Sequence, residues 1–347
     1  MKYILPLYLL LLMTSCTAFK NIEMHGADEF VMDSYKIQRG KEKILEMQGD
    51  EISHLSICDF QDYQIHIDEN DLLNISFFHP KREDFFKKFE NLSNQGFFCV
   101  KDGKICLPDI GVFQVKGMTI KQAEEEIQNC ILKEIDDAKI FVSFKKHSNF
   151  IEISGLCQNP KVFIDGKTKL YDVLVQAKIL PEANLFSSYL LRKGKIIKSI
   201  DFFKLLREGD LSQNIVMRKG DFIYIADPNS SKIMVMGEVG LCRIIPTLSG
   251  KIPVKEAITA AKGIPYTGSS SIYVIRGSIK DPKIFHLAFE HIMGLPNTSM
   301  LLMPGDVVYV SSKPITKWNR FISQILPTIG TAEMLTKGVK QVGIFLP

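Results

Sequence analysis

The chain has 347 residues, of which 46% are hydrophobic, and its 43 Lys and Arg nearly balance its 39 Asp and Glu, for a formal net charge of +4. This length predicts two or three domains of about 100 to 200 residues each, and the apolar content excludes a chain that is mainly disordered. The small net charge argues against nucleic-acid binding, as does the lack of an RNP motif, zinc-finger spacing or a Lys/Arg-rich run.

The first residues, MKYILPLYLLLLMTSC, have the layout of a bacterial lipoprotein signal peptide over residues 1–15. One Lys precedes an apolar stretch that is shorter than the about 20 residues needed to span a bilayer, and Thr14 and Ser15 stand just before Cys16. An ordinary secretory signal with a chance cysteine is the alternative. Acyl chains such as palmitate on Cys16 would each add about 0.8 kcal/mol of membrane affinity per buried CH₂.

Export would permit disulfides among the other six cysteines. In FFCVKDGKICLP, the pair Asp102-Gly103 predicts a two-residue hairpin turn, and pairing outward from this turn sets Cys99 opposite Cys106. Both a disulfide and two free thiols are compatible with this spacing. Residues 16–60 show no clear pattern beyond a short helix around Lys41–Met47, and we expect them to form a lipidated tether.

The first patterned block covers residues 61–147. YQIHIDENDLLNISFF predicts a strand, and the hairpin is followed by a second strand, a glycine turn and a helix. Thr119 is placed as the N-cap of this helix, with Gln122 in capping-box position. A last strand, AKIFVSFKK, closes the block. The apolar face of the predicted helix carries Ala123, Ile127, Cys130 and Ile131.

Two copies of one module follow, over residues 150–228 and 232–312. FIEISGLCQNPKVFI matches KIMVMGEVGLCRIIP, LYDVLVQAKIL matches VKEAITAAKGI, and MRKGDFIYIAD matches LMPGDVVYVSS. Each copy is expected to run strand, turn, short helix, strand, helix, turn, strand, as a small α+β unit of β-grasp character. The first copy has Ile179 where the second has Gly263, so the loop after its helix is expected to differ.

No pattern of catalytic or metal-ligating residues is found, and the sequence predicts neither an enzyme nor a cofactor. The chain has no GxSxG, HExxH or P-loop. The acidic run AEEEI at 123–127 indicates a solvated helix face rather than the acid and base of a glycosidase, and the two Gly-Asp pairs before the last strands indicate turns. The seven scattered histidines, none with metal spacing, are His25, His54, His66, His79, His147, His286 and His291.

The stretch DGKICLPDIGVFQVKGMTIKQAEEEI resembles the core of the polysaccharide biosynthesis/export domain in outer-membrane polysaccharide export proteins of the Wza type. An Asp before LLNISFF fits the opening strand of the same domain. The resemblance implies an export domain at 61–147 and identifies the two repeated modules with the soluble ligand-binding β-grasp (SLBB) modules of that family. The motif residues are Asp71, Asp102, Gly103, Leu107, Pro108, Gly111, Gly117 and Thr119.

The segment KWNRFISQILPTIG predicts an amphipathic helix whose apolar face surrounds the single Trp. From 315 to 332 such a helix would be about 26 Å long, close to the thickness of an outer membrane, yet its polar face forbids crossing lipid alone. The apolar face comprises Ile315, Trp318, Phe321, Ile322, Ile325, Leu326, Ile329 and Ala332. The polar face comprises Asn319, Arg320, Ser323, Pro327 and Thr331.

Three arrangements would give both faces of this helix a suitable environment. It could lie flat on a membrane, pack into the protein's own core, or join copies of itself around a water-filled lumen. Pro327 leaves the carbonyl of Ser323 without its helical donor, and water in a lumen would satisfy that group. The sequence alone favours the first two arrangements. The resemblance favours the third, since Wza-type proteins end in an amphipathic helix that forms an α-helical barrel in the outer membrane. Residues 314–347 correspond to that helix.

The resemblance implies a lipid-anchored outer-membrane protein, with its bulk in the periplasm, whose copies form a porin-like ring. It implies an octamer, export of a capsular or other extracellular polysaccharide, and an inner-membrane polysaccharide copolymerase of the tyrosine-kinase or a related type as partner. One alternative is a periplasm-facing lipoprotein that binds glycan or peptidoglycan through its β-grasp modules. Another is a structural adaptor in a different envelope machine, such as a secretion complex.

Overall fold

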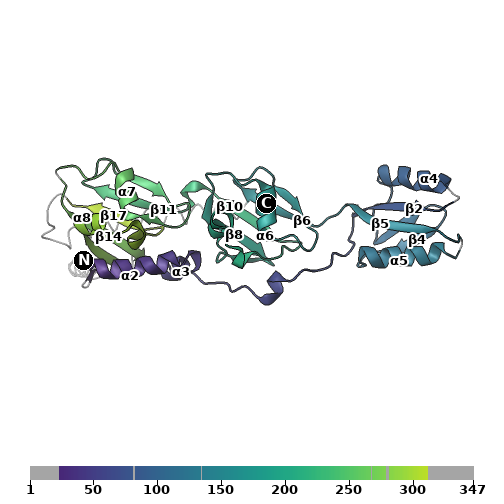
Figure 1. Ribbon diagram of the computed structural model, residues 1–347, viewed down its shortest axis with the longest axis horizontal. Coiled ribbons are helices and arrows are strands. Elements are labelled where there is room, and N and C mark those ends of the chain that lie inside the picture. The colour runs from purple at the N-terminus through teal and green to yellow at the C-terminus, as the bar shows by residue number, and fades with distance from the viewer. Residues whose placement is uncertain (1–22, 81–82, 134, 267, 279–280, 312–347) are drawn as a thin grey trace, which may run out of the picture.

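The computed structural model describes residues 23–80, 83–133, 135–266, 268–278 and 281–311. Figure 1 shows three folded bodies in a row along the long axis of the molecule. We call them the export body, the first module and the second module. Each has a hydrophobic core of its own, so the chain is a multidomain α+β protein.

The export body lies at one end of the row and has two helices on opposite sides of its strands (Figure 1). β2 pairs antiparallel with β5, and β3 with β4. Alternate residues of β2 point into the core, among them Ile75 and Phe77. Its elements are β2 (Leu72–Phe78), α4 (Glu83–Asn94), β3 (Lys104–Leu107), β4 (Gly111–Gln114), α5 (Ile120–Ile131) and β5 (Lys139–Lys146).

Two local predictions in the export body are confirmed. The Thr119 hydroxyl accepts a hydrogen bond from the Gln122 backbone amide, and the Thr119 backbone amide donates to the Gln122 side-chain oxygen, which completes the capping box of α5. Asp102 and Gly103 both have positive φ, +52° and +75°, as a two-residue hairpin turn requires. Cys99 is a free, half-buried thiol and Cys106 a free, exposed one.

The first module is a five-stranded sheet in the order β7-β6-β10-β8-β9, with β6 parallel to β10. Helix α6 packs its Leu170, Val173 and Leu174 against the sheet. The elements are β6 (Phe150–Gly155), β7 (Lys161–Phe163), α6 (Leu170–Ala177), β8 (Asn184–Arg192), β9 (Lys195–Ile197), the short helical turns η3 (Lys204–Glu208) and η4 (Leu211–Gln213), and β10 (Phe222–Ala226).

The second module repeats this arrangement, with β12-β11-β17-β14-β15 in the equivalent order and β11 parallel to β17. A turn, η5 (Pro228–Ser230), joins the two modules. The elements are β11 (Lys232–Gly237), β12 (Arg243–Pro246), β13 (Ile252–Pro253), α7 (Val254–Ala260), β14 (Ser271–Ser278), β15 (Asp281–Ala288), α8 (Phe289–Gly294), η6 (Asn297–Ser299), β16 (Leu301–Leu302) and β17 (Val307–Val310).

The matched glycines occupy equivalent places. Gly155 and Gly237 have φ of +98° and +91°, and a Cβ at either would lie 1.8 Å from the Ile225 carbonyl oxygen or 2.1 Å from that of Val310. The predicted element order omitted the short hairpin partners β7 and β9. In the loop after α6, the left-handed conformation falls on Lys178, so the following Ile needs no positive φ.

Residues 24–60, which we call the strap, pack along both modules (Figure 1). Strand β1 adds to the second module's sheet, parallel to β15, and the helix around 41–47 forms as predicted. Helix α2 was not predicted, because its buried face includes polar residues. The described part of the expected tether is therefore folded. The strap comprises β1 (Met24–His25), α2 (Ala27–Gln38), α3 (Lys41–Met47) and η2 (Ile57–Phe60).

The two modules are joined more closely to each other than to the export body. Between the modules, the Asn184 amide donates to Ser231 Oγ at 2.8 Å, and that hydroxyl donates to the Thr247 carbonyl at 2.8 Å, all buried. The export body meets the first module through exposed contacts, including the ion pair of Lys219 with Asp68. Buried hydrogen bonds hold geometry better than exposed ion pairs do.

Candidate functional site

Asp71 joins the two points where the chain enters and leaves the export body. Its carboxylate is fully buried and accepts hydrogen bonds from the backbone amides of Asp68 at 2.8 Å and Ser148 at 2.6 Å. Ser148 follows the last strand of the export body and precedes the first module. The opening residue of the family motif thus fixes the base of the domain.

The Asp102-Gly103 turn is held by a carboxylate that the sequence analysis did not single out. Glu69 accepts hydrogen bonds from the amides of Asp102 at 2.7 Å and Gly103 at 3.0 Å, one on each oxygen. The Gly103 carbonyl in turn accepts from the amides of Val115 and Lys116. This acidic residue lies 33 positions before the turn, and no local pattern connects the two.

The other motif residues also build the domain. Leu107 is buried opposite Gly111 in the β3-β4 hairpin, with Pro108 in the turn between them. Gly117 has a φ of +84° and donates its amide to the Ile67 carbonyl, and Thr119 caps α5. These residues shape turns and strand ends, and they do not converge on a common point as catalytic groups do.

A pocket of about 360 Å³ lies between the export body and the first module. Its charged side chains are already paired, with Lys219 on Asp68 and Lys116 at 3.9 Å from the same carboxylate. Among the residues that the structure describes, no group of three His, Cys, Asp or Glu side chains could hold a metal ion. The lining residues include Tyr63, His66, Asp68, Lys116, Gly117, Asn149 and Lys219.

Each module contains one buried arginine at an ionic centre. In the first module, Arg192 at the end of β8 binds the carboxylate of Asp221 through Nε at 2.9 Å and Nη2 at 2.6 Å. Its Nη1 donates to Asp59 of the strap at 2.6 Å. Asp221 belongs to one of the two Gly-Asp turns that the sequence predicted to be structural.

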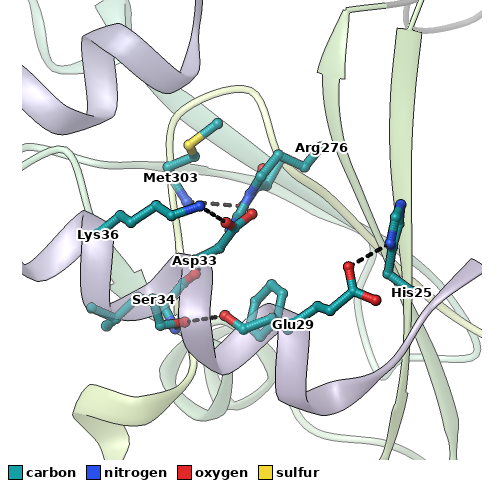
Figure 2. A network of polar contacts seen from close by, with 10 residues as sticks. His25, Glu29, Asp33, Ser34, Lys36, Arg276 and Met303 are labelled. Atoms are coloured by element: carbon teal, nitrogen blue, oxygen red, sulfur yellow. Dashed lines mark hydrogen bonds and ion pairs between the residues drawn. The ribbon is translucent and has the colours of Figure 1, made fainter.

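The second module repeats this centre with Arg276 on β14 and Asp306 of the other Gly-Asp turn. The guanidinium Nη1 lies 3.4 Å from Asp33 of helix α2, and the rings of Phe30 and Phe285 face it. Figure 2 shows Asp33 between Arg276 and Lys36, the latter ion pair at 3.0 Å. On the same helix, Glu29 reaches His25 at 2.6 Å.

In the first module's centre Arg192 and Asp59 keep their charges near neutral pH, whereas in the second module burial raises the pKa of Asp306 despite the opposing effect of Arg276. Burial alone would lower the pKa of Arg192, but Asp221 and Asp59 outweigh it and raise that pKa above its ordinary value. Partial burial raises the pKa of Asp59, yet hydrogen bonds from Ser56 and Arg192 outweigh it and leave the pKa below its ordinary value. Both groups therefore stay ionised in the folded chain.

The predicted lipidation residue Cys16 and both predicted faces of the C-terminal helix lie outside the described residues. Within residues 23–311, apart from the short gaps already given, no helix combines the length and the apolar character that a membrane span requires. The predicted membrane-facing and lumen-facing residues therefore stay predictions.

Two family models match this chain. The model described as polysaccharide biosynthesis/export protein matches residues 60–145, which are the export body. The model described as outer-membrane lipoprotein Wza C-terminal domain matches residues 314–342.

Relatives with established names point the same way. The EPS I polysaccharide export outer membrane protein EpsA of Ralstonia nicotianae is 26% identical over 244 residues, or 68% of this chain. The protein of the same name from Ralstonia solanacearum is 26% identical over 241 residues, or 67% of this chain. In both cases the chain spans 64% of the relative's length.

The two matched segments make this chain, whose described residues form a mixed α and β structure, similar to polysaccharide biosynthesis/export proteins. The resemblance to Wza-type export proteins that residues 102–127 predicted is confirmed by both matched segments and by these relatives.

Proposed function

We propose that this protein is a subunit of an outer-membrane channel that exports a capsular or extracellular polysaccharide from the periplasm to the cell surface. The two matched family segments and the relatives named as polysaccharide export outer membrane proteins support this function. In this proposal Cys16 carries the lipid anchor and most of the chain lies in the periplasm.

One structural observation carries the proposal: the start of the strap and the last described strand belong to the same sheet, that of the second module. Strand β1 pairs with β15 of that module, and β17 ends at Val310, just before the matched segment 314–342. The stretch from Cys16 to Met24 spans at most about 28 Å when fully extended. A lipid on Cys16 and a C-terminal membrane segment would thus bring the same module to the same membrane, with the export body farthest from it.

The C-terminal segment needs several copies to cross lipid. Arg320, Ser323 and Thr331 on its polar face would each be stranded in hydrocarbon if one helix crossed alone. A ring of copies turns Trp318, Phe321 and the other apolar residues to lipid and the polar residues to a common lumen. We propose such an α-helical barrel, with the octamer of the family as its expected size.

Transport through such a lumen requires no catalytic residue. Sugar hydroxyls keep water or polar side chains as hydrogen-bond partners on the way across, which removes the cost of transferring them into hydrocarbon. The energy for movement would come from a partner in the inner membrane, for which the polysaccharide copolymerase is the family's candidate. The export body, far from the proposed barrel, is the part placed to meet that partner.

A tag at the C-terminus tests this topology. We expect a tag after Pro347 to bind antibody on intact cells, because the barrel carries that end to the outside. A matched tag inserted after Gln95, in the exposed turn after α4, should bind antibody only after the outer membrane is permeabilised. If both tags stay hidden on intact cells, the chain is instead a periplasm-facing lipoprotein that binds glycan or peptidoglycan.

A further inference from the structure

We propose that each module carries a carboxylate-binding site, built around Arg192 in one and Arg276 in the other, that holds the strap as a peptide ligand. Asp59 occupies the first site and Asp33 the second. The strap is in this view a bound segment with two anchoring side chains, and the modules determine where it binds.

The two sites are equivalent atom by atom within the modules. Arg192 uses Nε and Nη2 on Asp221, and its Nη2 also donates to the Val216 carbonyl at 2.8 Å. Arg276 uses the same two nitrogens on Asp306, and its Nη2 donates to the Leu301 carbonyl at 2.9 Å. In both modules Nη1 is thus left to face the strap.

The strap satisfies the same module atoms at both sites. At the first, Asp59 accepts from Arg192 Nη1 through its carboxylate and from the Val216 amide through its carbonyl, at 2.8 Å. At the second, Asp33 faces Arg276 Nη1, and Ser34 Oγ accepts from the Leu301 amide at 2.9 Å. One guanidinium nitrogen and one backbone amide of each module therefore bind the strap.

This recurrence separates a built site from a chance ion pair. Asp33 lies in the long helix α2 and Asp59 in the short turn η2, so the strap itself has no repeat that would create the match. The arginine side chains are 8% and 3% exposed. A guanidinium nitrogen buried this deeply without a hydrogen-bond acceptor destabilises the folded protein. A carboxylate is therefore favoured at this position.

Occupation of both sites would determine how far the lipid on Cys16 can lie from the second module. This consequence rests on the proposed function. With the strap bound, residue 24 is held at β15 of the second module, whose last strand β17 precedes the C-terminal segment in the chain. With the strap released, the chain would first be fixed near Tyr63, whose amide bonds the Gly166 carbonyl. The lipid would then reach over about 160 Å of extended chain, and the second module would lose its fixed distance from the membrane.

Hydrogen exchange of the purified full-length chain tests the proposal without a pore or a lipid, so its failure is distinguishable from failure of the proposed function. Asp33→Asn should speed exchange of α2 amides, and Asp59→Asn should speed exchange of the Val216 amide, each by about tenfold or more, as loss of a charge-assisted bond predicts. The matched controls Asp28→Asn and Asp62→Asn, both exposed, should change these rates less than twofold.

Two further variants separate the sites from other effects. Asp59 also accepts from the Ser56 amide and hydroxyl, so Ser56→Ala tests the local turn, and we expect it to leave Val216 exchange within twofold of wild type. Asp33→Glu and Asp59→Glu keep the charge and should restore most of the protection, even if the Asn variants loosen a whole module. Equal exchange in Asn variants and controls, a Ser56→Ala effect as large as that of Asp59→Asn, or no restoration by Glu would each overturn the proposal.

Discussion

Gly155 and Gly237 show how single residues determine the joint between the first and last strands of each module. Both have positive φ, and both lie so close to a neighbouring carbonyl that no side chain fits. Gly220 and Gly305 also have positive φ but have open space around the position of a Cβ. Gly220 and Gly305 are therefore required only by the backbone conformation, whereas Gly155 and Gly237 are required by both the conformation and the lack of space.

Alanine substitutions at the two kinds of glycine should lower the free energy of unfolding by different amounts. Gly220→Ala should cost about 1–2 kcal/mol for the left-handed conformation alone. Gly155→Ala carries the same cost and adds a clash with the Ile225 carbonyl, so we expect at least about 3 kcal/mol. Exchange protection of the β10 amides measures both. Equal losses in the two variants would contradict the steric argument.

Among the elements, helix α3 begins with a buried lysine. Lys41 is buried, and its Nζ donates to the carbonyls of Ser188 at 2.7 Å and Ile200 at 3.0 Å. Burial lowers the pKa of Lys41 to about 7; Asp201 opposes this shift and Lys198 adds to it. A neutral amine keeps the donors that both carbonyls need, so loss of the proton leaves these contacts in place.

The docking of α3 should therefore strengthen as pH rises. A released Lys41 regains a pKa of about 10.4, so between pH 7 and about 10 the released state binds the extra proton. The docking free energy then becomes more favourable by up to about 1.4 kcal/mol per pH unit in this window, and it is flat below pH 7. Exchange protection of α3, corrected for intrinsic rates, measures this slope. Lys41→Met should be less protected and should show no slope, and an identical slope in both proteins would rule out Lys41 as its origin.

Local signals predicted some elements and not others, for physical reasons. The capping box of α5 and the Asp102-Gly103 turn were predictable because neighbouring residues contain all the needed chemistry. Helix α2 was missed because Asp33 and Ser34 on its buried face are satisfied only by Arg276 and the Leu301 amide, far along the chain. Similarly, β7 and β9 are three-residue strands whose existence depends on their partners β6 and β8.

At the scale of the whole molecule, the sequence repeat predicted two modules but not the path of the strap. Nothing in residues 16–60 indicates that they bind back along both modules, because their partners lie more than 100 positions away. The family motif indicated the export body, although its residues turned out to stabilise turns and the base of the domain. The ends of the described chain converge on the second module, which gives the proposed channel its direction.

The conductance of planar bilayers containing the lipidated full-length protein tests the channel most directly. We expect discrete openings of uniform size. Phe321→Asp, on the proposed lipid face, should abolish them, since a carboxylate in hydrocarbon costs several kcal/mol. Ser323→Asp, two residues away on the proposed lumen face, should keep the openings and shift their ion selectivity toward cations. Silent bilayers with the unaltered protein, or equal effects of the two substitutions, would contradict the account.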